Sequence, residues 1–205
     1  MTTIYLIRHA EAEGNLYRRI HGHYNALVTD NGYSQIAALE RRFADIHIDA
    51  VYASDLFRTI TTAGAISKPR GLQVHTDPDL REIGMGEWED TTWGYQGHFA
   101  GEELGQFNRL VPHWKAPGGE SRVELGQRVE RAMRRIAAAH PNQTVAVVSH
   151  GTAIQQFTAI VKELPPERWH ESPHTDNTSV SHFTFDGEKF ELHCEGDNSH
   201  LDENT

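Results

Sequence analysis

Two apolar runs along this chain each end at a polar residue and a histidine. Residues 4–7 are all apolar and lead into Arg8 and His9. Residues 145–148 repeat the pattern and lead through a serine into His150. An uninterrupted apolar run is typical of a strand buried on both faces, as in a parallel sheet. Open α/β sheets bind ligands at the carboxyl ends of such strands. If the two strands are neighbours, we expect the histidines to face one another across a shared site.

Helical and strand-like patterns alternate along the rest of the chain, which indicates an α/β fold. The fold is predicted to have three layers, a mostly parallel central sheet flanked by helices, with an antiparallel hairpin at its C-terminal end. Gly187 marks the turn of that hairpin. Helices are expected over 30–44, 55–68, 101–110, 121–140 and 152–163. Strands are expected over 3–8, 50–53, 73–76, 144–149, 179–185 and 189–195.

The least regular segment is 84–120, where glycines mix with aromatic residues. This composition predicts a lid or insertion over the strand ends. We expect residues 1–205 to form a single domain that includes it. The acidic end of the chain, residues 199–205, is expected to fray.

One arginine stands where helix geometry does not favour it. Ser54 follows a short predicted strand and is expected to be the N-cap of the next helix. Arg58 then falls in the first turn, where the helix macrodipole opposes a cation. The position is reasonable if Arg58 and the helix N-terminus both face a bound anion.

These motifs, in this order, resemble the histidine phosphatase superfamily, also called the phosphoglycerate-mutase-like family. The family motif Arg-His-Gly corresponds to Arg8-His9-Ala10, with alanine in place of the usual glycine. The segment 195–200 is similar to the chain ends of small bacterial broad-specificity phosphatases. The resemblance covers almost the whole chain and continues through Asn15, Gly22, 29–32, Ser54, Arg58, Glu82 and 149–151.

The resemblance implies a role for each catalytic candidate. His9 is expected to accept the phosphoryl group, although the residues alone do not distinguish His9 from His150 as the nucleophile. Arg8 and Arg58 are expected to clamp the phosphate, because a guanidinium matches phosphate oxygens in pairs. A protonated His150 would add a third cation. Glu82 is expected to protonate the leaving group and then activate water; its plain alternative is a surface salt bridge.

Several further residues are predicted to bind phosphate or line the pocket. Asn15 matches a family position that binds phosphate, and its alternative is a helix or turn cap. His21 and Gly22 are candidates for the pocket wall, and the helix start at Gly151 can offer backbone N–H groups. The complete predicted binding set is Arg8, Asn15, His21, Gly22, Arg58, His150 and Gly151.

Composition narrows the partners and the compartment. The net charge of −10 disfavours nucleic acids and anionic membranes as partners. The single cysteine, Cys194, predicts no internal disulfide and a reducing, cytoplasmic location. No apolar run approaches the ~18 residues of a membrane span. The 14 histidines lack metal-ligand spacing, so we expect no metal and no cofactor. The sequence does not decide whether the protein forms a homodimer.

The function these observations favour is a metal-independent phosphomonoester hydrolase, a histidine phosphatase of the acid type, acting through a phosphohistidine. One alternative is a cofactor-dependent phosphoglycerate mutase. Another is a non-catalytic module that binds phosphorylated ligands. In 83–120 the only bases are Arg109 and Lys115. That segment is therefore expected to suit an apolar or aromatic leaving group better than a small acid.

Overall fold

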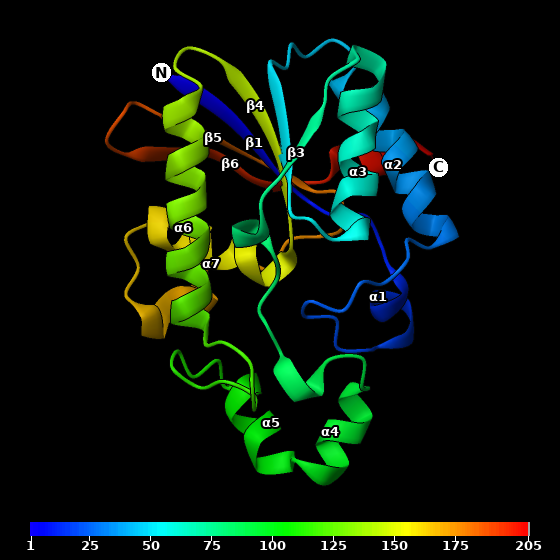
Figure 1. Cartoon of the computed structure of the whole chain (residues 1–205), viewed down its shortest axis with the longest axis vertical. Helices are drawn as coiled ribbons and strands as arrows, with labels where there is room; N and C mark the ends of the chain where they lie inside the picture. Colours follow the sequence, from blue (N-terminus) through cyan, green and yellow to red (C-terminus); the bar gives the residue numbers. More distant parts are fainter. Residues whose placement is uncertain (205) are drawn as a thin grey trace.

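A six-stranded sheet forms the centre of the molecule, in the order β3-β2-β4-β1-β5-β6 (Figure 1). The computed structural model describes residues 1–204 of the chain. Strands β1 to β4 pair in parallel, and β5 and β6 form an antiparallel hairpin that joins the sheet next to β1. The strands are β1 (Thr2–Arg8), β2 (Ala50–Ala53), β3 (Val74–Thr76), β4 (Thr144–Ser149), β5 (Val180–Phe185) and β6 (Phe190–Asp197). The predicted fold class is confirmed.

Helices cover both faces of the sheet. Helices α2 and α3 pack on one face, and α6 and α7 pack on the other. The α-helices are α1 (Glu13–Tyr17), α2 (Asp30–Phe43), α3 (Phe57–Ser67), α4 (Trp93–Phe99), α5 (Gly101–Asn108), α6 (Arg122–Ala139) and α7 (Gly151–Val161). Short 3-10 helices span Lys68–Arg70, Pro78–Leu80, Gly86–Trp88, Pro166–Glu171 and Ser199–Asn204.

The two central strands explain why their sequences are apolar without alternation. Leu6 of β1 and Val147 of β4 belong to the core beneath α6 and α7. Ile7 and Val148, one position later, belong to the core beneath α2 and α3. Because successive side chains of a strand point to opposite faces, both faces of β1 and β4 must be apolar.

The connections after β1 and β4 create a crevice between these neighbouring strands. The chain leaves β1 toward α2 on one face, and it leaves β4 into α7 on the other face. Such a switch point is where open α/β sheets bind ligands. Arg8 pairs with Ser149 in the parallel register, and the N–H of His9 donates to the carbonyl of Ser149 at 3.0 Å. The two strands therefore release His9 and His150 at the same level.

The segment 84–120 lies at one end of the long axis of the molecule (Figure 1). It carries two short helices, α4 and α5, of which only α5 is predicted from the sequence. Helix α4 contains Gly94 and Gly97, which have weak helix propensity, so its pattern does not indicate a helix. Helix α1 is also missed, because it has only five residues.

Ser54 is not the N-cap of the following helix, contrary to the sequence prediction. Helix α3 begins at Phe57, and Leu56 is its N-cap without a side-chain cap bond. The Oγ of Ser54 instead lies 2.7 Å from Nε2 of His150, because a buried imidazole needs a polar partner. Arg58 still falls in the first turn of α3, as predicted.

The predicted fraying of the chain end is wrong over Ser199–Asn204, which forms a 3-10 helix. His200 is buried, and its Nδ1 accepts a hydrogen bond of 3.1 Å from Arg42. Arg42 also forms an ion pair with Asp197 at 2.6 Å. These contacts hold the chain end against α2. Thr205 lies outside the described residues. Between residues 1 and 204, no helix is both long and apolar enough to span a bilayer.

Candidate active site

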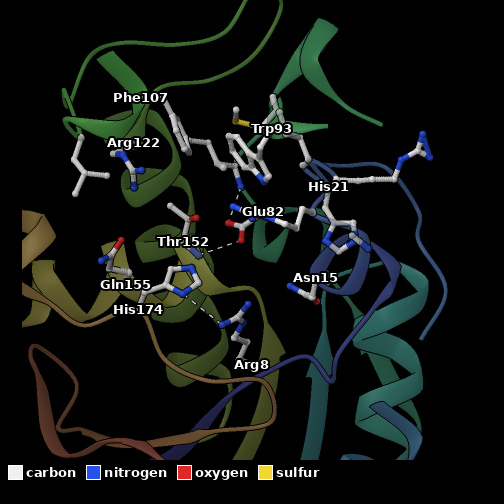
Figure 2. Close-up of a pocket in the computed structure, with 18 residues that line it drawn as sticks. Arg8, Asn15, His21, Glu82, Trp93, Phe107, Arg122, Thr152, Gln155 and His174 are labelled. Carbon is white, nitrogen blue, oxygen red and sulfur yellow. Dashed lines mark hydrogen bonds between the residues drawn. The ribbon is translucent and has the colours of Figure 1, made fainter. Parts of the chain in front are cut away.

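A cavity of about 580 Å³ lies at the carboxyl ends of β1 and β4 (Figure 2). Three predicted catalytic residues, His9, Arg58 and His150, are almost completely buried, with exposed fractions of 3%, 0% and 0%. They therefore form the inner layer of the site, behind the residues that line the cavity. The labelled lining residues in Figure 2 are Arg8, Asn15, His21, Glu82, Trp93, Phe107, Arg122, Thr152, Gln155 and His174.

The two strand-end histidines face one another as predicted. The ring centroids of His9 and His150 are 5.1 Å apart, with the ring planes at 60°. Nδ1 of His9 lies 2.7 Å from the carbonyl oxygen of Ala10. A carbonyl only accepts, so Nδ1 carries the hydrogen and Nε2 of the neutral ring keeps its lone pair.

His150 is held in the opposite way. Its Nδ1 accepts a hydrogen bond from Nε of Arg58 at 3.3 Å, because a guanidinium only donates. Its Nε2 therefore carries the hydrogen and donates to Oγ of Ser54 at 2.7 Å. Both nitrogens of His150 are thus engaged by the protein, whereas Nε2 of His9 has no hydrogen-bond partner among residues 1–204 and keeps its lone pair. This difference separates the two histidines, which the sequence alone leaves equivalent.

Electrostatics keep both rings neutral. Burial lowers the pKa of His9 well below its usual value, and the charges of Arg58 and Arg8 lower it further. Burial and then Arg58 likewise lower the pKa of His150. His150 is therefore not the third cation that the sequence suggests, because it accepts from Arg58. A neutral imidazole is the form of histidine that acts as a nucleophile.

Arg58 is a completely buried cation that is bound to neutral acceptors. Its terminal nitrogens donate to the carbonyls of Gly22 at 2.9 Å and Tyr24 at 2.8 Å. Burial lowers its pKa to about 10, so the guanidinium stays charged at neutral pH. Arg58 lies behind the cavity wall and projects its charge toward His9 and the site.

Arg8 extends into the cavity from the end of β1. One of its terminal nitrogens donates to the carbonyl of Thr175 and lies 3.4 Å from Nδ1 of His174. Its Nε is buried and has no hydrogen-bond partner among residues 1–204. Burial lowers the pKa of Arg8, with Glu82 and Asp176 opposing that shift. Arg8 therefore brings a largely desolvated positive charge to the cavity wall.

Glu82 is held by backbone N–H groups. The N–H of Thr152 donates to its Oε2 at 3.1 Å, and the N–H of Ala153 donates to its Oε1 at 3.2 Å. Both donors belong to the first turn of α7, which attracts negative charge. The N–H of Ile83 donates to Oε1 at 2.9 Å. These contacts place the carboxylate at the cavity wall, so Glu82 is not the surface salt bridge that was its alternative.

The remaining predicted residues also meet at this site. Asn15 lines the cavity, and its Oδ1 accepts from the N–H of Ala12 at 3.0 Å, so it is also a helix cap. His21 accepts from the N–H of Gly14 at 2.7 Å, and burial followed by Arg58 lowers its pKa to about 4. Gly22 lines the cavity at a φ of 48°, a conformation that favours glycine.

Gly151 is needed at the start of α7 for close packing. A Cβ there would lie 2.5 Å from the His174 ring and 3.3 Å from Cζ of Arg8. The absent side chain lets Arg8 and His174 lie directly against the helix N-terminus.

Besides the exposed Arg18 and Arg19, sequence reasoning misses four polar residues of the cavity wall. Thr152 and Gln155 lie in α7, where only periodicity is readable, and the loop around His174 carries no motif. Arg122 could be found from the sequence, because it directly follows the helix-capping residue Ser121. It is therefore a cation in the first turn of a helix, where the macrodipole opposes positive charge. The four residues are Arg122, Thr152, Gln155 and His174.

No cluster of metal-ligating side chains lies in the described part of the chain. Within residues 1–204, no three or more His, Cys, Asp or Glu residues are placed to hold a metal ion. The charges near His9 come instead from Arg8 and Arg58. The site therefore has a neutral nucleophile, a carboxylate and guanidinium cations, which together suit the transfer of an anionic group such as phosphoryl.

Comparison with known proteins agrees with this geometry. The sequence model of the "Histidine phosphatase superfamily (branch 1)" matches residues 4–198. Phosphoglycerate mutase-like protein 4 of Arabidopsis thaliana is 34% identical over 204 residues, covering 98% of this chain and 87% of that protein.

Two solved structures resemble the whole fold. YhfR of Bacillus stearothermophilus has a TM-score of 0.93 and 31% identity, covering 98% of this chain and 100% of its own. The alpha-ribazole phosphatase of Shigella flexneri has a TM-score of 0.86 and 26% identity, covering 95% of this chain and 96% of its own.

The buried neutral histidines predict that the folded protein loses stability in acid. The pKa values of His9 and His150 lie below the ~6.5 of an unfolded chain, so below about pH 6.5 the unfolded chain binds protons that the folded protein does not. Each histidine should lower the free energy of unfolding by about 1.4 kcal/mol per pH unit, down to its folded pKa.

Urea unfolding at several pH values between about 7.5 and 5 measures this slope. His9→Gln cannot take up the proton, so it should reduce the slope by about 1.4 kcal/mol per pH unit. A free energy of unfolding that does not change between about pH 7 and 5.5 would contradict the burial of neutral rings.

Proposed function

This chain belongs to the histidine phosphatase superfamily, and we propose that it is a metal-independent phosphomonoester hydrolase that acts through a phosphohistidine. One observation carries the proposal: His9 is fixed through Nδ1 and keeps a free lone pair on Nε2, beside two arginines. A nucleophile needs a deprotonated nitrogen and a fixed orientation, and this ring has both.

In the first step, Nε2 of His9 attacks phosphorus and the bond to the leaving oxygen breaks. Glu82, in its protonated form, gives its proton to that oxygen, so the product leaves as an alcohol. Arg8 and Arg58 stabilise the charge that spreads over the phosphoryl oxygens. The carbonyl of Ala10 stabilises the ring as it becomes positively charged, because it accepts from Nδ1.

In the second step, water attacks the phosphorus of the phosphohistidine. Glu82, now a carboxylate, takes a proton from the water, and the bond between phosphorus and Nε2 breaks. Phosphate leaves, and His9 returns to its neutral form. Because one carboxylate acts as acid and then as base, the cycle needs no further titrating group.

The runner-up is a phosphoglycerate mutase, which shares the first step and returns the phosphoryl group to an acid. The Arabidopsis relative supports it by its name. The alpha-ribazole phosphatase supports hydrolysis by its name, at lower identity. The cavity has a nucleophile, a carboxylate and arginine cations beside it. This set of groups supports a catalyst over a module that only binds phosphorylated ligands. We also propose that the enzyme is cytoplasmic and uses no cofactor.

The assignment of the nucleophile predicts where phosphate is trapped. Rapid acid quench and base quench after mixing with a ³²P-labelled phosphomonoester should give a base-stable, acid-labile phosphoprotein in the unmodified enzyme. His9→Ala should give no label, because the free Nε2 is lost. His150→Ala should still be labelled, at a lower rate. Label that persists in His9→Ala and vanishes in His150→Ala would reverse the assignment.

The role of Glu82 predicts a dependence on the leaving group. Glu82→Gln should lower kcat/KM for glycerol 3-phosphate by about 10²–10⁴-fold, because a poor alkoxide leaving group needs the proton. The loss with p-nitrophenyl phosphate should be much smaller, since its leaving group is stable as an anion. Glu13→Gln is the matched control and should change neither value. Equal losses on both substrates would mean that Glu82 is not the acid.

Hydrolysis itself is tested with a panel of phosphomonoesters, assayed by released phosphate with and without excess EDTA. We expect turnover that EDTA does not reduce, because arginines supply the positive charge. We also expect interconversion of 2- and 3-phosphoglycerate to be slower than phosphate release. Turnover lost in EDTA and restored by a divalent cation would disprove the mechanism. Faster interconversion than hydrolysis would favour the mutase.

A further inference from the structure

Arg122 brings a positive charge to the cavity from a helix that the mechanism does not otherwise use. It is the first residue of α6, and its side chain reaches the cavity wall beside Phe107 (Figure 2). Its Cζ lies 5.0 Å from the centroid of the Phe107 ring. Arg122 is only 7% exposed, so the guanidinium is largely removed from solvent.

This placement is unfavourable for an arginine unless an anion joins it. The first turn of a helix opposes a cation, and burial of an unpaired charge is costly. Burial lowers the pKa of Arg122, which Glu82 only partly offsets. Within residues 1–204, Arg122 forms no hydrogen bond or ion pair, and its contact with Phe107 is a cation–π interaction. The protein therefore holds a buried cation with unused donors in the cavity.

Two other arginines that line the cavity lack these properties. Arg18 and Arg19 also line the cavity, but both are exposed. Arg19 is in addition paired with Asp90 at 3.0 Å. Solvent stabilises these two charges without any ligand, so of these three arginines only Arg122 is both buried and without a hydrogen bond to residues 1–204.

We propose that Arg122 binds a carboxylate on the leaving group of the phosphomonoester, an inference that rests on the proposed function. The planar guanidinium matches a carboxylate with two parallel hydrogen bonds. One cation neutralises the single charge of a carboxylate. The phosphate end, which takes a dianion, has two arginines, Arg8 and Arg58.

The order of residues along the cavity fits such a substrate. Figure 2 shows Arg8 at one end, Arg122 and Phe107 at the other, and Glu82 between them. A phosphate beside Arg8 and His9 places the leaving oxygen toward Glu82, and the rest of the leaving group then extends toward Arg122. Phe107 and Trp93 cover its carbon atoms. The aromatic wall of 83–120 thus borders an acid-binding position supplied from outside that segment.

The test compares two ligands that differ only at the proposed carboxylate. 3-Phosphoglycerate carries a carboxylate where glycerol 3-phosphate carries a hydroxymethyl group. Binding is measured by calorimetry in the His9→Ala enzyme, which lacks the nucleophile, so that the ligands are not turned over during the titration. Adding Arg122→Met, which keeps the apolar stem, should reduce the preference for 3-phosphoglycerate by about 10- to 100-fold. Arg122→Lys should lose less, because the charge remains.

Arg109→Met is the matched control, since Arg109 is an exposed arginine of 83–120, and it should leave the preference unchanged. Circular dichroism checks that each variant is folded. Three results would overturn the proposal. Arg122→Met weakens the binding of both ligands equally, it weakens the binding of neither, or the His9→Ala parent does not bind 3-phosphoglycerate. The proposal would also fail if Arg122→Met weakened only the binding of fructose 1,6-bisphosphate and not that of fructose 6-phosphate. That result would assign Arg122 to a second phosphate.

The same variants assayed for released phosphate separate the two levels of the argument. If the enzyme hydrolyses no phosphomonoester but Arg122→Met still removes the binding preference, the hydrolase proposal fails and the carboxylate position stands. If hydrolysis is robust and the ratio of kcat/KM for the two substrates is unaffected by Arg122→Met, the hydrolase stands and the carboxylate position fails.

Discussion

The parallel pairing of β1 with β4 is the constraint on which the site depends. The register that places Arg8 opposite Ser149 also brings the His9 and His150 rings to 5.1 Å. A slip of one residue would turn the side chains of a strand to the opposite face. The register is fixed because both faces of both strands are buried in apolar cores. Hydrophobic burial far from the cavity therefore determines the geometry of the reacting groups.

The site is built around positive charge that the protein does not neutralise. Arg58 is completely buried and donates to two carbonyl groups and a neutral histidine. Arg8 keeps a buried Nε–H that has no acceptor among residues 1–204. Such an arrangement costs stability in the empty protein, and under the proposed function the bound phosphate offsets that cost. Burial is the main cause of the lowered pKa of His9, and the same charges lower it further, since another cation beside them is unfavourable. Under the proposed function, the arginines that bind the phosphate thus also help to keep the nucleophile neutral.

The sequence predicts the strand-end residues well, because strand patterns are local and the carboxyl ends of parallel strands share an edge. It does not predict hydrogen-bond partners between distant elements. Ser54 looks like a helix cap, but it binds His150, which lies 96 residues away. The different roles of His9 and His150 likewise depend on tertiary contacts. Arg122 carries the same signal as Arg58, a cation in the first turn of a helix, yet only the fold brings it to the cavity.

The turn between β4 and α7 links His150 to the backbone groups that hold Glu82. His150 ends the strand side of this turn, and the N–H groups of Thr152 and Ala153 hold Glu82 two residues later. A shift of this turn would move the inner histidine and the carboxylate together. Under the proposed function, this one turn therefore sets the distance from the phosphate position to the leaving oxygen. Beyond Glu82 the cavity is lined by side chains from other elements, such as Arg122 and Phe107, so under the proposed function recognition of the leaving group can change without altering the reacting groups.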